Sequence, residues 1–186
     1  MVFGYTVVHA LVGIALVSSE YIRDLMSLES DLRQGNPTVI NQEKPVLILT
    51  VGLPQSGKST WARKQGVPVV SMDAVRMAMH GKPFIPEAES WVHLQTKTMV
   101  KALFYAGHFV VILDACNHTC QSRASWLRIN IWRVAFMPFY VTGEICRRRA
   151  KANHRDDLVP VIKKMASELE YMYVDEGPTL NDVSPL

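Results

Sequence analysis

The amino-acid sequence predicts an α/β domain built around a mainly parallel β-sheet. Two observations carry this prediction. Short apolar runs alternate with longer helical stretches, and the first apolar run leads directly into a glycine-rich turn and a helix. A run that is apolar throughout is typical of a parallel strand, because helices cover both faces of such a sheet. The 186 residues, 48% of them hydrophobic, suffice for the core of one such domain.

The predicted elements follow one another in a regular order. We expect strands at residues 46–51, 67–71, 109–113 and 134–141. We expect helices at residues 58–65, 73–80, 86–106, 121–130, 143–153 and 160–173. Gly81 and Gly107 mark two of the helix ends, because glycine readily takes the left-handed conformation in which many helices stop.

The chain is expected to divide into three parts: a helical extension and linker at residues 1–44, the α/β domain at 45–174 and an irregular tail at 175–186. The apolar run Val2–Val17 has no basic residue before it and is shorter than a bilayer span. It therefore favours an amphipathic or buried helix over a membrane anchor. The three cysteines make no disulfide framework, which indicates a reducing compartment, the cytoplasm. The oligomeric state stays open.

The turn after the first strand matches the phosphate-binding pattern G-x-x-x-x-G-K-[ST] in full. Its glycines allow a ligand to approach the backbone closely, and its N–H groups point at phosphate oxygens. The lysine neutralises the β and γ phosphates, and the following serine binds Mg²⁺. We therefore predict ATP and Mg²⁺ as cofactors. The residues expected to hold them here are Gly52, Leu53, Pro54, Gln55, Ser56, Gly57, Lys58, Ser59 and Thr60.

An acid and an arginine follow the second predicted strand. Residues just past the carboxyl ends of parallel strands face the ligand crevice, and Asp73 occupies such a position. A carboxylate there can accept a proton from an attacking hydroxyl. Arg76, three residues later on the same helical face, can hold a phosphate of the acceptor. The alternatives are that Asp73 only caps the helix and that Arg76 is only solvated.

The third predicted strand also ends in an acid, Asp114. An apolar strand that ends in an aspartate has the form of a Walker B element, whose carboxylate orients Mg²⁺ or its waters. An aspartate at a strand end can also be a simple turn former. Because the phosphate-binding pattern lies in the same domain, we assign Asp114, together with Ser59, to the metal site.

Basic residues gather in the last quarter of the chain, although the formal net charge of the whole sequence is only +3. The run Arg147–Arg155 is expected to form a helix and the loop after it. Such arginines can fold over a nucleotide as a lid that neutralises charge and excludes water. The alternative is a solvated basic helix face. The mild overall charge argues against a dedicated nucleic-acid-binding protein.

Four segments together resemble the P-loop polynucleotide 5′-hydroxyl kinases and the wider AAA_33-type group of small P-loop kinases. They are GLPQSGKSTWAR at 52–63, SMDAVR at 71–76, VILDACNHTCQSRASWL at 111–127 and the late arginine cluster. The similarity covers about residues 46–170. Cys116 stands where the group usually has threonine, and no phosphatase domain follows.

The resemblance implies an adenylate-kinase-like P-loop NTPase fold, in which a sheet lies between two layers of helices (α/β/α), with a helical lid. It implies that Lys58 and Ser59 serve ATP and Mg²⁺, that Asp73 activates the acceptor hydroxyl, and that Arg76 contacts the acceptor's phosphate. It further assigns to the nucleotide or the lid the residues Asp114, Asn117, Arg123, Arg148 and Arg155.

Three functions remain open at this point. The leading one is an ATP-dependent kinase that phosphorylates the 5′-hydroxyl of DNA or RNA. The second is a small-molecule kinase on the same core, which the modest net charge leaves plausible. The third is a nucleotide-binding interaction module without kinase activity, attached through the first 33 residues.

Overall fold

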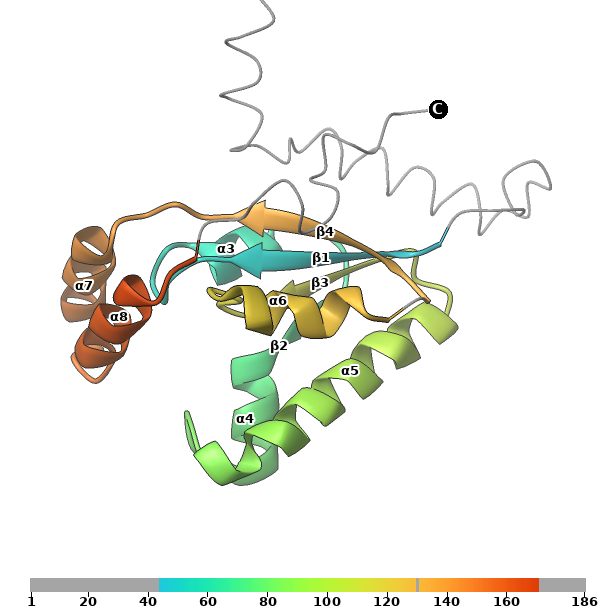
Figure 1. Cartoon of the computed structure of the whole chain (residues 1–186), viewed down its shortest axis with the longest axis horizontal. Coiled ribbons are helices and arrows are strands. Elements are labelled where there is room, and N and C mark those ends of the chain that lie inside the picture. Colours follow the sequence, from blue (N-terminus) through green and yellow to red (C-terminus); the bar gives the residue numbers. More distant parts are fainter. Residues whose placement is uncertain (1–43, 130, 171–186) are drawn as a thin grey trace, which may run out of the picture.

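Four parallel strands form the centre of the structure, a computed structural model that describes residues 44–129 and 131–170. They are β1 (Val46–Val51), β2 (Val69–Ser71), β3 (Val110–Asp114) and β4 (Arg133–Pro138), in the order β2-β3-β1-β4 (Figure 1). The neighbouring pair β1 and β3 brings the phosphate-binding turn next to Asp114. The predicted tail, and the extension up to residue 43, lie outside the described residues.

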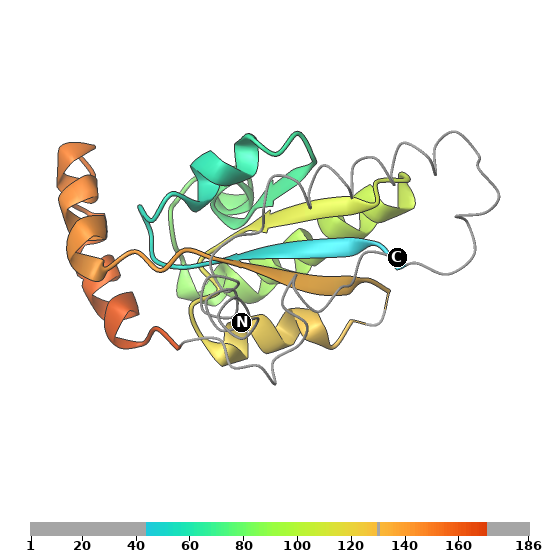
Figure 2. The ribbon, with the colours of Figure 1, turned by 90° about the horizontal axis from the view of Figure 1, so that it is seen from above.

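Helices cover both faces of this sheet, as predicted. Every residue of β1 is buried, and successive strand residues point to opposite faces. Leu47 and Leu49 contribute to one hydrophobic cluster, which includes residues of α4 (Met72–His80), α5 (Glu89–Tyr105) and α6 (Cys120–Leu127). Val46 and Ile48 contribute to a second cluster, with Ala62 of α3 (Lys58–Arg63). Figure 2 shows α3 on one side of the sheet and α6 on the other.

The strands and helices predicted within the described residues are present, β1 with the predicted limits and the others with shifted ones. β2 starts at Val69 rather than at residue 67. β4 ends at Pro138 rather than at residue 141, and the chain then leaves the sheet for the lid. Pro86 opens a short 3₁₀ turn, η1 (Pro86–Ala88), and α5 follows it. Gly81 and Gly107 have φ angles of 69° and 92°, the left-handed conformation expected after α4 and α5.

Two helices, α7 (Gly143–Ala152) and α8 (Leu158–Ser167), project beyond the carboxyl ends of the strands (Figures 1 and 2). They have a small hydrophobic core of their own, in which Leu53 of the phosphate-binding turn packs with Cys146, Ala150 and Ile162. The last helix was expected at 160–173. It begins at Leu158 and ends at Ser167. Helix α7 and the loop after it contain the run Arg147–Arg155 that was predicted to form a lid, and the helix pair α7 and α8 is called the lid from here on.

Within the described residues, no helix has both the length and the apolar character that crossing a membrane requires.

Candidate active site

The turn after β1 has the backbone of a phosphate cradle. Gly52, Gln55 and Gly57 have φ angles of 147°, 64° and 109°. A Cβ at Gly52 would lie 2.8 Å from the carbonyl oxygen of Phe139, so only glycine fits there. Lys58 is 6% exposed, and its Nζ donates to the carbonyl of Leu53 at 2.6 Å. The lysine therefore lies inside the loop, where a phosphate can reach it.

Hydrogen bonds fasten the end of β3 to this turn. The Thr50 hydroxyl donates to the carbonyl of Ala115 at 2.8 Å and accepts from its N–H at 3.1 Å. Gly52 N–H donates to the carbonyl of Cys116 at 2.8 Å, and Asn117 Nδ2 donates to the carbonyl of Thr50 at 2.9 Å. The loop that begins at the end of β3 is therefore held against the phosphate-binding turn.

A cavity of about 880 Å³ opens where these segments meet. Its lining combines the phosphate-binding turn, the start of α4, the end of β3 and the lid. Ser59 and Asp114 both belong to this lining. Oxygen donors of this kind are those that Mg²⁺ prefers, so the residues present fit the predicted metal. The volume and the cradle likewise fit a nucleoside triphosphate.

Asp73 lines the same cavity, and its side chain is 88% exposed. The alternative that Asp73 caps α4 is wrong. The N-cap residue is Ser71, whose hydroxyl accepts a hydrogen bond from Ala74 N–H at 3.4 Å. The Asp73 carboxylate is therefore not engaged as the cap of its own helix. It contacts Arg76, whose Nη1 donates to Oδ1 at 2.6 Å.

Arg76 also binds Glu89, a residue that we did not assign to the site from the sequence. Arg76 Nε and Nη2 donate to the two carboxylate oxygens of Glu89 at 2.8 and 2.7 Å. The hydrogen bond from Arg76 holds the pKa of Glu89 below its usual value, and the same bond raises the pKa of Arg76, although burial opposes both shifts. Arg76 is thus a fixed member of an ionic trio and not a freely solvated arginine.

Helix α7 contributes one arginine to the cavity. Arg149 Nη1 donates to the carbonyls of Gln55 and Ser56 at 3.2 and 3.3 Å, and Asn153 Nδ2 donates to Gln55 Oε1 at 2.9 Å. The predicted residue Arg148 is exposed and is not part of the cavity lining. The structure therefore places the arginine of α7 one residue later than expected.

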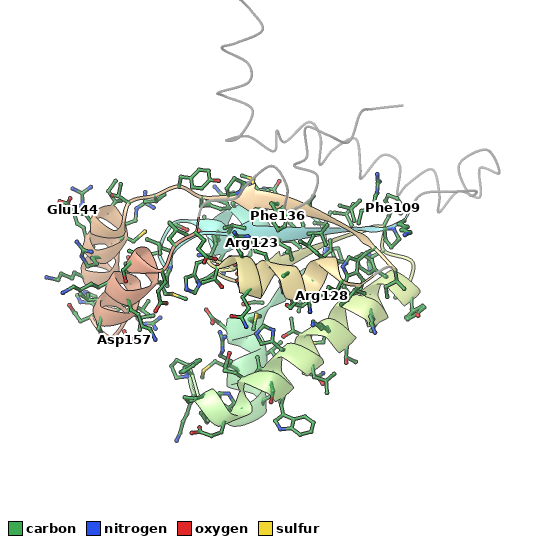
Figure 3. The ribbon with its side chains drawn as sticks, in the orientation of Figure 1. Phe109, Arg123, Arg128, Phe136, Glu144 and Asp157 are labelled. Atoms are coloured by element: carbon green, nitrogen blue, oxygen red, sulfur yellow. The ribbon has the colours of Figure 1, made fainter. Side chains whose placement is uncertain are left out.

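The other predicted lid arginine, Arg155, does line the cavity. Its Nε and Nη2 donate to the carboxylate of Asp157 at 2.9 and 2.8 Å. Asp157 lies at the outer end of the helix pair, as Figure 3 shows. This hydrogen bond raises the pKa of Arg155, so the guanidinium stays charged beside the cavity.

Arg123 is one of the predicted nucleotide-binding residues that lie outside the cavity lining, with Gly52, Leu53 and Ser56. Its side chain is completely buried at the start of α6 (Figure 3) and does not line the cavity. Its Nη1 donates to the carbonyls of Asn117 and Glu170 at 3.1 and 3.2 Å, and its Nη2 donates to Cys120 Sγ at 3.2 Å. The prediction is corrected in this respect. Arg123 stabilises the loop after β3 through its hydrogen bond to the Asn117 carbonyl, whereas Asn117 itself lines the cavity.

The phosphate-binding residues also divide by position. Pro54, Gln55, Gly57, Lys58, Ser59 and Thr60 line the cavity. Leu53, in contrast, is 1% exposed and belongs to the core of the lid. Its backbone carbonyl is the acceptor for Lys58. Leucine at this position thus ties the phosphate-binding turn to the helices that cover it.

Comparison with known proteins supports this assignment of the fold. The AAA_33 family model, described as an AAA domain, matches residues 47–170. A chain of the Pnkp1/Rnl/Hen1 RNA repair complex superposes with a TM-score of 0.54 at 22% identity, over 69% of this chain and 47% of that chain. This chain therefore spans about half the length of that relative. No curated protein matches the sequence.

Two further solved structures cover a similar share of the chain. A putative kinase from Chloroflexus aurantiacus has a TM-score of 0.55 at 13% identity, over 77% of this chain and 93% of that one. A sugar kinase from Janibacter sp. has a TM-score of 0.53 at 18% identity, over 73% and 83%. At these identities the likeness establishes the P-loop NTPase fold. Because the family match spans most of the chain, the protein belongs to the AAA_33 family of P-loop proteins.

Proposed function

We propose that this protein is an ATP-dependent phosphotransferase that moves the γ-phosphoryl group to a hydroxyl. The acceptor that we assign is the 5′-hydroxyl of a polynucleotide. One observation carries the proposal. The carboxylate of Asp73 lines the same cavity as Lys58 and Asp114. A carboxylate in this cavity that does not cap its own helix can accept the proton of an acceptor hydroxyl.

The residues divide the chemistry between them. When bound, ATP supplies the phosphoryl group and Mg²⁺ neutralises part of its charge. Lys58 and the N–H groups of the turn hold the phosphates, and Ser59 and Asp114 hold the metal. Asp73 accepts the proton of the attacking hydroxyl. Because the transition state spreads negative charge over the transferred group, the guanidinium groups of the lid stabilise it by electrostatic attraction.

Arg76 is suited to orienting the acceptor. Three of its N–H groups are engaged by Asp73 and Glu89, and further N–H groups remain on Nη1 and Nη2. These can donate to a phosphate of the terminal nucleotide. The guanidinium of Arg76 would then position both the substrate hydroxyl and Asp73, which accepts the proton of that hydroxyl.

The charge around Arg76 also favours a second candidate, a kinase for an uncharged small molecule such as a sugar. Two carboxylates, Asp73 and Glu89, surround this one guanidinium, so the trio is net negative. An uncharged polyol would meet no electrostatic penalty there, whereas a highly anionic acceptor would.

A substrate panel tests the two candidates. The full chain is incubated with γ-labelled ATP and Mg²⁺, and with 5′-hydroxyl oligonucleotides, 5′-phosphorylated oligonucleotides of the same sequence, or sugars. We expect label on the 5′-hydroxyl oligonucleotides alone. Because the blocked oligonucleotides have the same charge along their backbone, they are the matched control. Label only on sugars would establish the second candidate, and release of phosphate with no labelled acceptor would reject both.

A further inference from the structure

One aromatic side chain at the cavity is not explained by folding. Phe84 lies in the loop between α4 and η1, after Gly81 ends α4. The side chain is 60% exposed, yet it lines the cavity. It belongs to none of the hydrophobic clusters of the described residues. A large apolar side chain that is exposed inside a binding cavity is available to a ligand.

The cavity lining that contains Phe84 also contains the residues assigned to the acceptor. Asp73, Arg76, Glu89 and His93 line the cavity with it. Burial lowers the pKa of His93, which favours its neutral form. Phe84 and His93 therefore add aromatic surface to the cavity that the ionic trio also lines. The two kinds of surface suit a ligand that has both a flat apolar part and a polar hydroxyl.

We propose that Phe84 is a stacking platform for the terminal base of the acceptor, whose 5′-hydroxyl lies at Asp73. This inference rests on the proposed function and deepens it, because it makes the acceptor a chain that ends in a complete nucleoside. Every base has a flat π-face, so stacking on phenylalanine tolerates any base sequence. A base is also uncharged, so its binding does not require the guanidinium of Arg76, which two carboxylates already engage.

The loop that carries Phe84 has a second feature of a nucleic-acid contact. Lys82, two residues earlier, is exposed, and both residues lie in the short segment between α4 and η1. An aromatic side chain next to a cation is the combination by which single strands are bound, since the aromatic stacks on a base and the cation attracts the backbone. A single exposed phenylalanine is common on protein surfaces. Its place in the cavity lining distinguishes Phe84 from such residues.

The test compares two 5′-hydroxyl oligonucleotides that are identical except that one lacks its terminal base. Because stacking contributes only where a base is present, Phe84→Ala should raise the KM for the complete oligonucleotide about tenfold. It should leave the KM for the abasic-ended one and the KM for ATP unchanged. Phe84→Leu keeps apolar volume without the ring and should behave like Phe84→Ala. Phe84→Trp should retain the preference for the complete end.

Tyr105 provides the matched control. It is an aromatic side chain that is 84% exposed, but it lies at the far end of α5, about 24 Å along the helix from Glu89. Tyr105→Ala should leave both KM values unchanged. If Phe84→Ala changes both oligonucleotides equally, changes neither, or is matched by Tyr105→Ala, the platform is rejected.

Equilibrium binding of the same two oligonucleotides separates this inference from the proposed function. The wild-type chain should bind the complete end about tenfold more tightly, and Phe84→Ala should abolish that difference. If this preference is found but no phosphate is transferred, the platform stands and the kinase proposal falls. If phosphate is transferred and the wild type shows no preference, the kinase proposal stands and the platform falls. If neither is found, both are rejected.

Discussion

Glu89 holds Arg76 through two parallel hydrogen bonds, from Nε to Oε1 at 2.8 Å and from Nη2 to Oε2 at 2.7 Å. The two residues lie on different helices, α5 and α4, and their side chains are 20% and 17% exposed. A carboxylate that binds a guanidinium at two points fixes its plane as well as its position. Glu89 therefore sets the orientation in which Arg76 contacts Asp73.

Replacing Glu89 with glutamine should impair the acceptor reaction and spare the nucleotide. The amide keeps the size of the side chain, but its NH₂ group faces the donors of Arg76 and one hydrogen bond is lost. We expect kcat/KM for the acceptor to fall about tenfold, with KM for ATP unchanged. Glu87→Gln, a change in η1 outside the cavity lining, is the matched control. Equal losses in the two variants, measured by initial rates, would contradict the positioning role.

The same ion pair should make stability depend on acid pH. The hydrogen bond from Arg76 lowers the pKa of Glu89 in the folded chain. The ion pair therefore contributes fully to stability above 4.5, the pKa of Glu89 in the unfolded chain. It is lost as the pH falls through the folded pKa. In urea unfolding at about pH 6, the free energy of unfolding of the wild type should exceed that of Glu89→Gln by about 1 kcal/mol, and this difference should shrink as the pH is lowered below 4.5. A difference that grows on acidification would contradict this linkage.

Replacing Asp73 with asparagine should remove the proton acceptor and leave the nucleotide site intact. The Asp73 side chain is 88% exposed and does not cap its helix, so the fold does not depend on it. We expect kcat to fall on the order of a hundredfold or more. ATP affinity, measured by calorimetric titration, should remain near that of the wild type. Asp156→Asn, an exposed acid outside the cavity lining, should retain full activity. Unchanged turnover in Asp73→Asn would show that another group accepts the proton.

The sequence predicts the centre of the fold better than its edges, for a physical reason. β1 was predicted to the residue, because a run buried on both faces is continuously apolar and ends at a proline and a glycine. The apolar run of β4 continues beyond the strand, because the apolar residues after it pack against helices. The ring of Phe139 packs edge-on against Trp61 of α3, with centroids 5.8 Å apart, and Val141 packs in the lid core. Apolar pattern alone does not distinguish these partners from the sheet.

The sequence likewise predicts some residues of the candidate site and misses others. The phosphate-binding turn and Asp114 are recognisable because their chemistry is encoded in consecutive residues. Glu89 is not, since its contact with Arg76 depends on how two helices cross. Arg123 looks like a site residue but lies on the buried side of its helix. The choice between Arg148 and Arg149 depends on which face of α7 meets the phosphate-binding turn, because neighbouring helical residues point about 100° apart, and the sequence does not give that orientation.

Removing the amine of Lys58 should weaken ATP binding severely. Lys58 Nζ lies inside the phosphate-binding turn, within hydrogen-bonding distance of the Leu53 carbonyl and, at 3.4 Å, of Ser56 Oγ. Lys58→Ala removes both this internal support and the charge that neutralises phosphate. We expect the Kd for ATP to rise on the order of a hundredfold. Lys64→Ala, an exposed lysine just after α3, is the control and should bind normally. Normal binding by Lys58→Ala would exclude the turn as the phosphate site.

The two neighbouring arginines of α7, Arg148 and Arg149, should contribute differently to phosphoryl transfer. Arg149 donates to the carbonyls of Gln55 and Ser56, so its guanidinium already lies over the phosphate-binding turn, whereas Arg148 is not part of the cavity lining. A positive charge in that place stabilises the charge that develops on the transferred phosphoryl group. Arg149→Ala should therefore reduce kcat about tenfold to a hundredfold in single-turnover transfer from ATP, and Arg148→Ala should leave it within about twofold. Because both variants remove one charge from the same helix, a shared electrostatic effect would reduce both rates alike. A larger loss in Arg148→Ala would mean that α7 turns when the lid closes on the nucleotide.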